Sequence, residues 1–203
     1  YAIPLLAGDV LGVIDEVGVE RAHVVGHDWG SALAWSIAAF APDRVDHLVA
    51  MSVGHPGAFA TAGLPQREKS WYMLLFQFEG VAERWLTNDD WANFREWSGY
   101  PEPDRVIADL ERDRSLTPGL NYYRANLRPE RLVEPGSPVP AVGAPTMGIW
   151  SSGDIALLEP QMTGSAQFVE NTWRYERIDG VGHWMQLEQP DTVNRLLLDF
   201  LPR

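Results

Sequence analysis

Two kinds of apolar pattern alternate along the chain. Short runs rich in apolar, β-branched and aromatic residues predict strands at 22–26, 47–53, 146–150 and 172–178. Apolar residues at helical spacing predict helices at 4–17, 31–41, 158–169 and 191–200. The first helix should end near Gly18, and Pro190 suits the start of the last helix. Strands that alternate with helices are typical of a parallel sheet, so the sequence predicts an α/β fold.

The middle of the chain has a different character. From about Gly63 to Arg131 the pattern is helical, aromatic and charged, with no convincing strand. A proline-dense stretch at 134–140 follows, which disfavours regular structure. Because strands are expected on both sides, we interpret this region as a helical lid over the carboxyl edge of the sheet, where such folds bind ligands. The expected organisation is core at 1–58, lid at 59–140 and core again at 141–203.

Composition narrows the class of partner. The chain carries 28 acidic and 16 basic residues, a formal net charge of −12, which argues against a nucleic-acid partner and an anionic membrane surface. It has no cysteine, which excludes disulfides, zinc–thiolate sites and thiol nucleophiles. No apolar run is long enough to span a bilayer. We expect a small-molecule substrate and neither a metal nor another cofactor.

The sequence starts with Tyr1 and enters a helical pattern almost at once. We therefore expect that it lacks its natural N-terminus, so the missing signal peptide does not decide the compartment. We predict a cytoplasmic location.

The segment Gly26-His27-Asp28-Trp29-Gly30 joins a predicted strand directly to a predicted helix. This Gly-x-Asp-x-Gly pattern is typical of a nucleophile elbow, with aspartate where serine is more familiar. The glycines tolerate a sharp turn and a close approach of two backbones, which exposes the Asp28 side chain. An ionised carboxylate needs no base to act as a nucleophile, and its attack on an alkyl carbon forms an ester. A helix-capping role for Asp28 is the alternative, but it does not explain both glycines.

Turnover requires hydrolysis of that ester by water, with a base and an acid that orients the base. Asp154 follows the strand at 146–150 by a short turn, and His183 lies just after the last strand, in the loop Gly180–Trp184. Both are therefore expected at the sheet edge of Asp28, in the chain order that this fold class uses. The alternative role for Asp154 is to cap a helix or stabilise a turn. However, the other position at which such folds place the acid, the loop at 54–57, holds no carboxylate.

The other histidines fit the role of base less well. His23 and His47 lie near strand starts, at the opposite end of the sheet, and His55 is confined between a glycine and a proline. We expect His27 to point away from Asp28, because neighbouring side chains diverge at a tight turn.

Negative charge develops on the carbonyl oxygen of Asp28 while its ester is hydrolysed. The backbone N–H of Trp29, the residue after the nucleophile, is expected to donate to that oxygen. A second donor normally lies on an earlier loop, which this sequence does not contain.

These motifs together resemble the epoxide hydrolases of the α/β-hydrolase superfamily, and the resemblance covers nearly the whole chain. Two further segments, Phe76–Glu83 and Asn121–Arg124, resemble the lid markers of that family. The resemblance implies that Tyr72 and Tyr123 are the two lid tyrosines that hydrogen-bond the epoxide oxygen. A phenol can donate to the alkoxide formed on ring opening without being charged beforehand. Ordinary packing of either tyrosine in the lid, and a one-residue shift to Tyr122, stay open.

The sequence also departs from this family. The family has an N-terminal stretch with several strands and a His-Gly-x-Pro loop that supplies the second oxyanion donor, and neither is present. Two other functions are therefore considered. A haloalkane or haloacid dehalogenase uses the same Asp-His-acid machinery, and an incomplete hydrolase could serve as a binding scaffold. The paired tyrosines favour an epoxide, and the apolar lid favours an apolar substituent on it.

Overall fold

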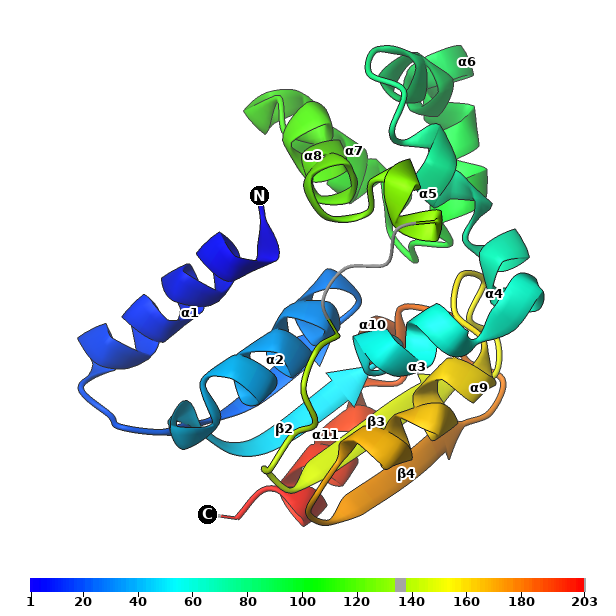
Figure 1. Cartoon of the computed structure of the whole chain (residues 1–203). Helices are drawn as coiled ribbons and strands as arrows, with labels where there is room; N and C mark the ends of the chain where they lie inside the picture. The colour runs from blue at the N-terminus through cyan, green and yellow to red at the C-terminus, as the bar shows by residue number, and fades with distance from the viewer. Residues whose placement is uncertain (134–137, 203) are drawn as a thin grey trace.

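The computed structural model describes residues 1–133 and 138–202 (Figure 1). One sheet of parallel strands runs in the order β1-β2-β3-β4, formed by β1 (Ala22–His27), β2 (Val45–Met51), β3 (Thr146–Ser151) and β4 (Trp173–Ile178). The strands are separated along the chain by helices, which a parallel connection requires. The predicted α/β class with a parallel sheet is confirmed.

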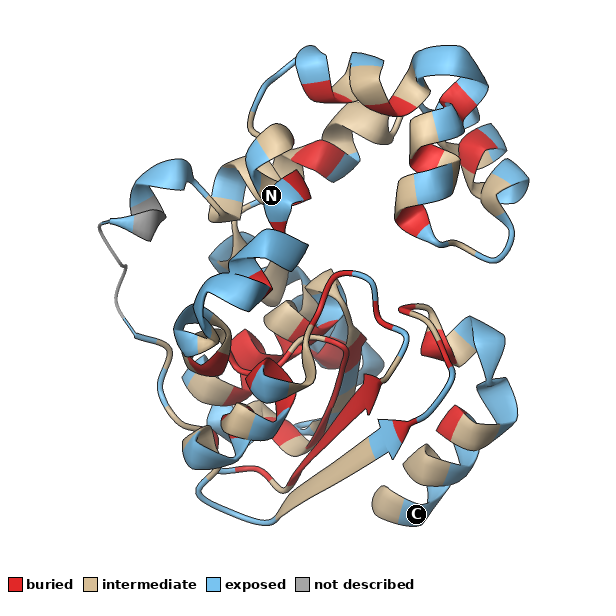
Figure 2. Ribbon diagram, turned by 90° about the vertical axis from the view of Figure 1, so that its right-hand side faces the viewer, coloured by how far each residue is buried: buried red, intermediate tan, exposed pale blue. Residues whose placement is uncertain are grey.

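Helices cover both faces of the sheet (Figure 1). On β2, Leu48 and Ala50 pack against α2 (Trp29–Phe40), behind which lies α1 (Ile3–Val17). Val49 and Met51 point to the other face, where α10 (Met185–Glu188) and α11 (Pro190–Phe200) pack. Side chains alternate along a strand, so a central strand that is apolar at successive positions buries both faces. Figure 2 shows the buried residues gathered along the central strands.

A run of helices lies between β2 and β3 in the chain. It consists of α3 (Pro56–Thr61), α4 (Gly63–Lys69), α5 (Trp71–Leu75), α6 (Val81–Ser98), α7 (Pro103–Asp113), α8 (Leu116–Asn126) and η2 (Pro129–Leu132). We call α4 to α8 the helical insert; α3 packs instead on the core elements α9 (Glu159–Thr163) and η3 (Gly164–Phe168). The insert has its own aromatic core, which also takes in Ala156 and Leu157 from the segment after β3. The expected absence of strands over 63–131 is confirmed.

Several element bounds differ from the sequence prediction, and three of these differences have a clear structural basis. β2 ends at Met51 because Ser52 has a φ of 66°, which leaves the strand conformation. α2 begins at Trp29, since the chain passes from Asp28 straight into the helix. The helix expected at 158–169 changes to 3₁₀ geometry at Gly164. Two predicted bounds are confirmed: α1 ends before Gly18, which has a φ of 78°, and α11 begins at Pro190.

Within the proline-dense stretch, residues 134–137 lie outside the described residues, and 138–140 are irregular.

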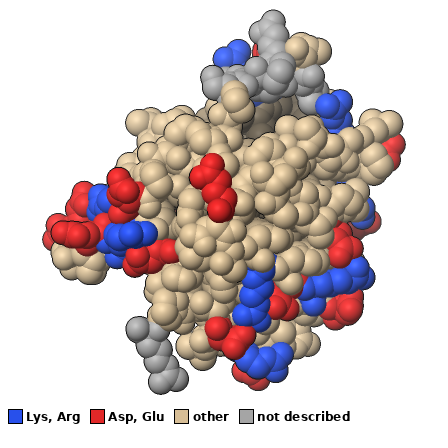
Figure 3. Space-filling view, turned by 60° about the horizontal axis from the view of Figure 1, so that its bottom comes forward, with Lys and Arg blue, Asp and Glu red and all other residues tan. Residues whose placement is uncertain are grey.

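β1 is an edge of the described sheet, and Val25 on it is 40% exposed. Charges of both signs lie side by side along the margins of the face in Figure 3. Across 1–133 and 138–202, we find no helix with the length and apolarity that crossing a membrane requires.

Candidate active site

Asp28 occupies a strained turn between β1 and α2. Its backbone has φ 52° and ψ −118°, a region that non-glycine residues rarely adopt. A Cβ on Gly26 would lie 2.1 Å from the carbonyl oxygen of Gly30, so only glycine fits there. A Cβ on Gly30 would meet nothing within 4 Å. The close approach expected of both glycines is thus required at Gly26 alone.

The carboxylate of Asp28 faces two partners with its two oxygens. Oδ2 accepts a 2.7 Å hydrogen bond from the backbone N–H of Trp29. Oδ1 lies 3.5 Å from Nε2 of His183. The Asp28 side chain is 25% exposed, whereas that of His183 is 9% exposed. The carboxylate is therefore open on one side, with a donor and an imidazole fixed on the others.

His183 is held from behind by Asp154. Its Nδ1 lies 3.0 Å from Oδ2 of Asp154, whose side chain is fully buried. The other oxygen of Asp154 accepts 2.9 Å hydrogen bonds from the backbone N–H groups of Ala156 and Leu157. The hydroxyl of Ser52 also donates to Oδ2, at 2.8 Å. Hydrogen bonds to both oxygens stabilise the ionised form of this buried carboxylate.

Both ring nitrogens of His27 face groups other than Asp28. Its ring packs 4.7 Å from that of His183, between centroids, and its Nε2 lies 2.9 Å from the backbone oxygen of His183. Its Nδ1 faces Gln186 at 3.3 Å. The loop that carries His183 folds back over the end of β1, which local turn geometry does not reveal. His27 therefore supports the loop that carries His183.

The remaining histidines lie away from Asp28. His23 and His47 pack on each other on neighbouring strands, 5.0 Å apart between centroids. His55 is fully buried, accepts a hydrogen bond from the backbone N–H of Gly57, and reaches the carbonyl of Pro140 with its Nε2. Its environment is that of a packed core residue.

Tyr72 and Tyr123 of the helical insert meet in front of Asp28. Their rings lie 5.9 Å apart in an edge-to-face arrangement, and Phe76 touches both of them. Tyr72 is 3% exposed. Burial and the negative charge of Asp28 act on the pKa of both phenols. The structure thus brings residues from α5 and α8 together with the elbow.

Tyr122, the alternative to Tyr123, points elsewhere. Its ring packs on Tyr1 and on the Trp29 indole, at centroid distances of 5.3 and 5.7 Å. The direction of its side chain is set by its place on α8, about 100° around the helix from Tyr123.

The titratable groups of the site, Asp28, Asp154, His183, Tyr72 and Tyr123, shift one another's pKa values. Burial alone would lower the pKa of His183, but hydrogen bonds and charges from Asp154 and Asp28 raise it to about 10. Burial opposes ionisation of the two aspartates, yet His183 lowers the pKa of each. Burial and the charge of Asp28 raise the pKa of both Tyr72 and Tyr123. The resting cluster is therefore an imidazolium between two carboxylates, beneath two neutral phenols.

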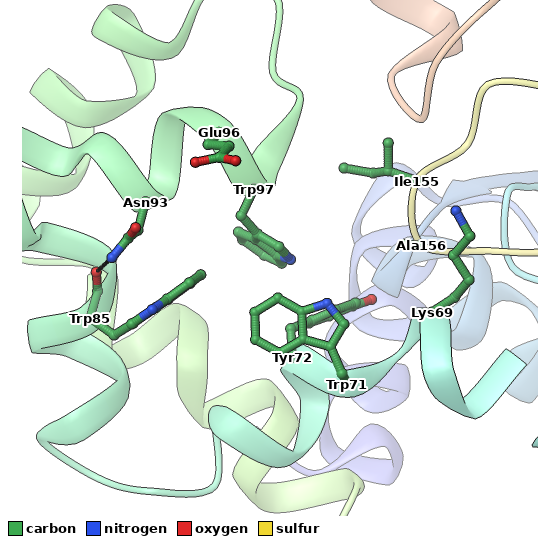
Figure 4. A pocket seen from close by; sticks show the side chains of 9 residues that line it. All are labelled: Lys69, Trp71, Tyr72, Trp85, Asn93, Glu96, Trp97, Ile155 and Ala156. Carbon is green, nitrogen blue, oxygen red and sulfur yellow. Dashed lines mark hydrogen bonds between the residues drawn. The ribbon is translucent and has the colours of Figure 1, made fainter.

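A pocket of about 340 Å³ adjoins the phenol of Tyr72 (Figure 4). It lies between the helical insert and the segment that follows Asp154, and indole rings form much of its wall. Its lining includes Lys69, Trp71, Trp85, Trp97, Ile155 and Ala156. Among the described residues there is no cluster of three or more side chains suited to holding a metal ion.

The sequence analysis missed Ser52 and the backbone donors of Ala156 and Leu157. A polar residue directly after the buried strand β2 was the available signal for Ser52, because it lies at the same sheet edge as Asp154. The two backbone donors carry no signal in their side chains.

Comparison with known proteins places the chain in a family. The sequence profile described as alpha/beta hydrolase fold matches residues 1–190. The chain belongs to the α/β-hydrolase fold family. It is 31% identical to Epoxide hydrolase 3 of Xenopus tropicalis, over 99% of this chain and 58% of that protein. It is 30% identical to the AB hydrolase superfamily protein YfhM of Bacillus subtilis, over 99% of this chain and 73% of that protein.

Solved structures agree with this assignment. A mutant of an epoxide hydrolase from Bacillus megaterium superposes with a TM-score of 0.85 at 26% identity, over 100% of this chain and 77% of that one. The chain spans 53% to 58% of the length of two epoxide hydrolases to which it is similar, from Caenorhabditis elegans and Xenopus tropicalis.

Proposed function

We propose that this α/β-hydrolase opens an epoxide to a vicinal diol through an ester on Asp28. The observation that carries the proposal is the carboxylate on the strained elbow, 3.5 Å from His183 and faced by two phenols. Carboxylate, imidazole and neutral donor are the parts that covalent opening and hydrolysis of an epoxide require. The names of the relatives support the same reaction.

In the first half-reaction, an oxygen of Asp28 attacks an epoxide carbon and the carbon–oxygen bond of the ring breaks. The released oxygen takes a proton, or a strong hydrogen bond, from Tyr72 and Tyr123. In the second, water loses a proton to Nε2 of His183 and attacks the carboxyl carbon of Asp28. The backbone N–H of Trp29, already 2.7 Å from Oδ2, stabilises the charge that develops there. The acyl–oxygen bond then breaks and the leaving oxygen takes a proton from His183, which releases the diol. The carboxyl group gives up the proton that came with water, and proton exchange with solvent restores the carboxylate, the phenol and the imidazolium.

The charge of Asp28 links the two half-reactions. While Asp28 is ionised, it helps to keep His183 protonated and the phenols neutral. Esterification removes that charge, so the pKa of His183 falls and the imidazole can release its proton and accept one from water. Formation of the ester therefore enables His183 to act as the base in the hydrolysis of that ester.

The helical insert acts in this proposal as the lid expected over 59–140, with the core parts at 1–58 and 141–203. Its phenols close the site, and the indole-lined pocket beside Tyr72 suits an apolar substituent of the epoxide. A small-molecule epoxide is the proposed substrate. The cytoplasmic location stays a prediction from the sequence.

A trapping experiment tests the mechanism. His183→Gln removes the base but leaves the nucleophile, so incubation with styrene oxide should add the mass of one epoxide to the protein. Peptide mapping should place the addition on Asp28, and Asp28→Asn in the same background should abolish it. If the wild-type protein forms no diol and His183→Gln forms no adduct with styrene oxide or an aliphatic terminal epoxide, the proposal is wrong.

Dehalogenation by the same carboxylate is the second candidate function. A halide leaving group needs hydrogen-bond donors but no proton. The Trp29 indole packs edge-on against the ring of Tyr123, at a centroid distance of 5.0 Å. Halide release from 1-bromobutane, measured beside diol formation from the matching epoxide, separates the two functions. An incomplete hydrolase that acts only as a scaffold would show neither product.

A further inference from the structure

The end of β2 contains a buried residue in a conformation that costs free energy. Ser52 has a φ of 66°, and the backbone N–H of Val53 donates to the carbonyl of Met51 at 2.9 Å. A hydrogen bond from residue i+2 to residue i around a positive φ defines a γ-turn of the rare, strained kind. Ser52 is 0% exposed. Strain of this kind persists only where surrounding contacts fix the conformation.

Gln161 on α9 fixes this turn from the side. Its Nε2 donates to the carbonyl of Ser52 at 2.8 Å, and its Oε1 accepts from the backbone N–H of Gly54 at 2.5 Å. Gln161 is itself 0% exposed. A Cβ on Gly54 would lie 2.2 Å from the backbone oxygen of Gln161, so the turn and α9 are in direct contact. The amide thus bridges both ends of the turn and leaves Ser52 little freedom.

The turn directs the hydroxyl of Ser52 at the acid and the base together. Oγ lies 2.8 Å from Oδ2 of Asp154 and 3.3 Å from Nδ1 of His183. The hydroxyl donates to the same carboxylate oxygen that accepts the imidazole N–H. A second donor on that oxygen shares its negative charge and weakens its attraction for the imidazole proton.

We propose that Ser52 is a positioning residue, held by Gln161, that aligns Asp154 with His183 and makes the imidazole proton easier to release. The proposal rests on the proposed function, because proton release from His183 precedes ester hydrolysis. Ser52 does not touch the substrate or the reacting atoms in this role. It acts through Asp154.

The proposal predicts a change in the titration of His183. Asp28 and His27 face the imidazole from the elbow, Asp154 faces it from the loop after β3, and Glu188 binds the backbone N–H of Gly182 next to it. We would place every variant in an Asp28→Asn background, because the neutral amide imitates the charge state of the ester. All other titratable neighbours then stay constant, and only the hydroxyl differs.

The experiment is a pH titration of ¹⁵N-labelled histidine by NMR for the background protein, Ser52→Ala, Ser52→Gly and Ser31→Ala. Loss of the Ser52 hydroxyl should raise the pKa of His183 by about 0.5 to 1 unit in both variants. Ser52→Gly also relieves the strained φ, so agreement between the two variants assigns the shift to the hydroxyl. Ser31 is the matched control: it is buried, and its hydroxyl donates at 2.6 Å to the carbonyl of Val53, in the loop that follows Ser52, rather than to Asp154.

Ser31→Ala should leave the titration within about 0.2 units of the background protein. If Ser52→Gly is folded and His183 titrates unchanged in it, the proposal is overturned; Ser52→Gly decides this even if Ser52→Ala fails to fold. The titration needs no substrate, so its result is independent of whether the protein hydrolyses epoxides. With Asp28 restored, Ser52→Gly should move the acidic limb of the ester-hydrolysis rate to higher pH by a similar amount, and an unmoved limb would also overturn the proposal.

Discussion

The α/β core and the helical insert both supply polar groups to the candidate site, but they hold them differently. The core holds Asp154 with hydrogen bonds to both of its oxygens, from backbone N–H groups and a hydroxyl. The insert holds Tyr72 among aromatic rings, with Phe76 and Trp97 at centroid distances of 5.5 and 5.0 Å.

This difference follows from charge. A buried carboxylate needs polar partners, and loops at the carboxyl ends of strands supply them in the form of free backbone N–H groups. A phenol is neutral, so apolar rings can fix most of its surface while one hydroxyl stays available. Changes in the core should therefore affect charge and covalent chemistry, whereas changes in the insert should affect the donation of a proton.

The largest effect is expected from Asp28, the proposed nucleophile in the core. Asp28→Asn should lower the turnover of styrene oxide by about 10⁴-fold or more, because an amide is not a useful nucleophile. Product formation is measured by chromatography of the diol. The circular dichroism spectrum of the variant should match that of the wild type, since the amide oxygen can still accept from Trp29. Turnover within about tenfold of wild type would contradict the assignment of the nucleophile.

The paired phenols should give the next largest effect. Tyr72→Phe and Tyr123→Phe should each slow formation of the adduct, and the double variant should slow it by about 10²- to 10³-fold. The rate is followed by quenched mass spectrometry in the His183→Gln background. Tyr122→Phe is the matched control and should keep the rate of that background. A double variant no slower than either single variant would argue against paired donation.

The two elbow glycines, both in the core, should differ in their effect on the free energy of unfolding. Gly26→Ala should lower the free energy of unfolding by about 3 kcal/mol, because its Cβ would lie 2.1 Å from the oxygen of Gly30. Gly30→Ala places its Cβ in open space on α2, and should change stability by about 1 kcal/mol or less. Urea unfolding measures both. Equal losses would mean that the two backbones do not approach as described.

The smallest effect concerns the dependence of stability on pH. The pKa of His183 is raised to about 10 in the folded state, so its contribution is complete below its unfolded pKa and is lost as pH rises through 10. We expect the free energy of unfolding to fall by about 1 to 3 kcal/mol between pH 6.5 and 10.

His183→Gln is the control for this prediction. It should remove most of that alkaline loss, as measured by urea unfolding at several pH values. On the acid side, the pKa values of Asp28 and Asp154 are lowered, so their contribution is present above their unfolded pKa and is lost as pH falls below it. An alkaline loss of the same size in His183→Gln would mean that another group causes it.

The sequence by itself determined the α/β class, the strands and the place of the helical insert. Local patterns specify these features: apolar runs indicate the strands, helical spacing indicates the helices, and Gly18 and Pro190 mark a helix end and a helix start. It also indicated Asp28, Asp154 and His183 as one group, because the ends of parallel strands meet at one edge of a sheet. Their catalytic roles are still predictions.

Only the tertiary structure decided the contacts between residues far apart in the chain. It directed Tyr123 rather than Tyr122 toward Asp28, turned His27 onto His183, and joined Ser52 to Asp154 across 102 positions. It also separated the two elbow glycines, of which only Gly26 is in a close contact. Local patterns specify the conformation of a segment, but which side chains meet depends on how the segments pack, and that is settled by the whole fold at once.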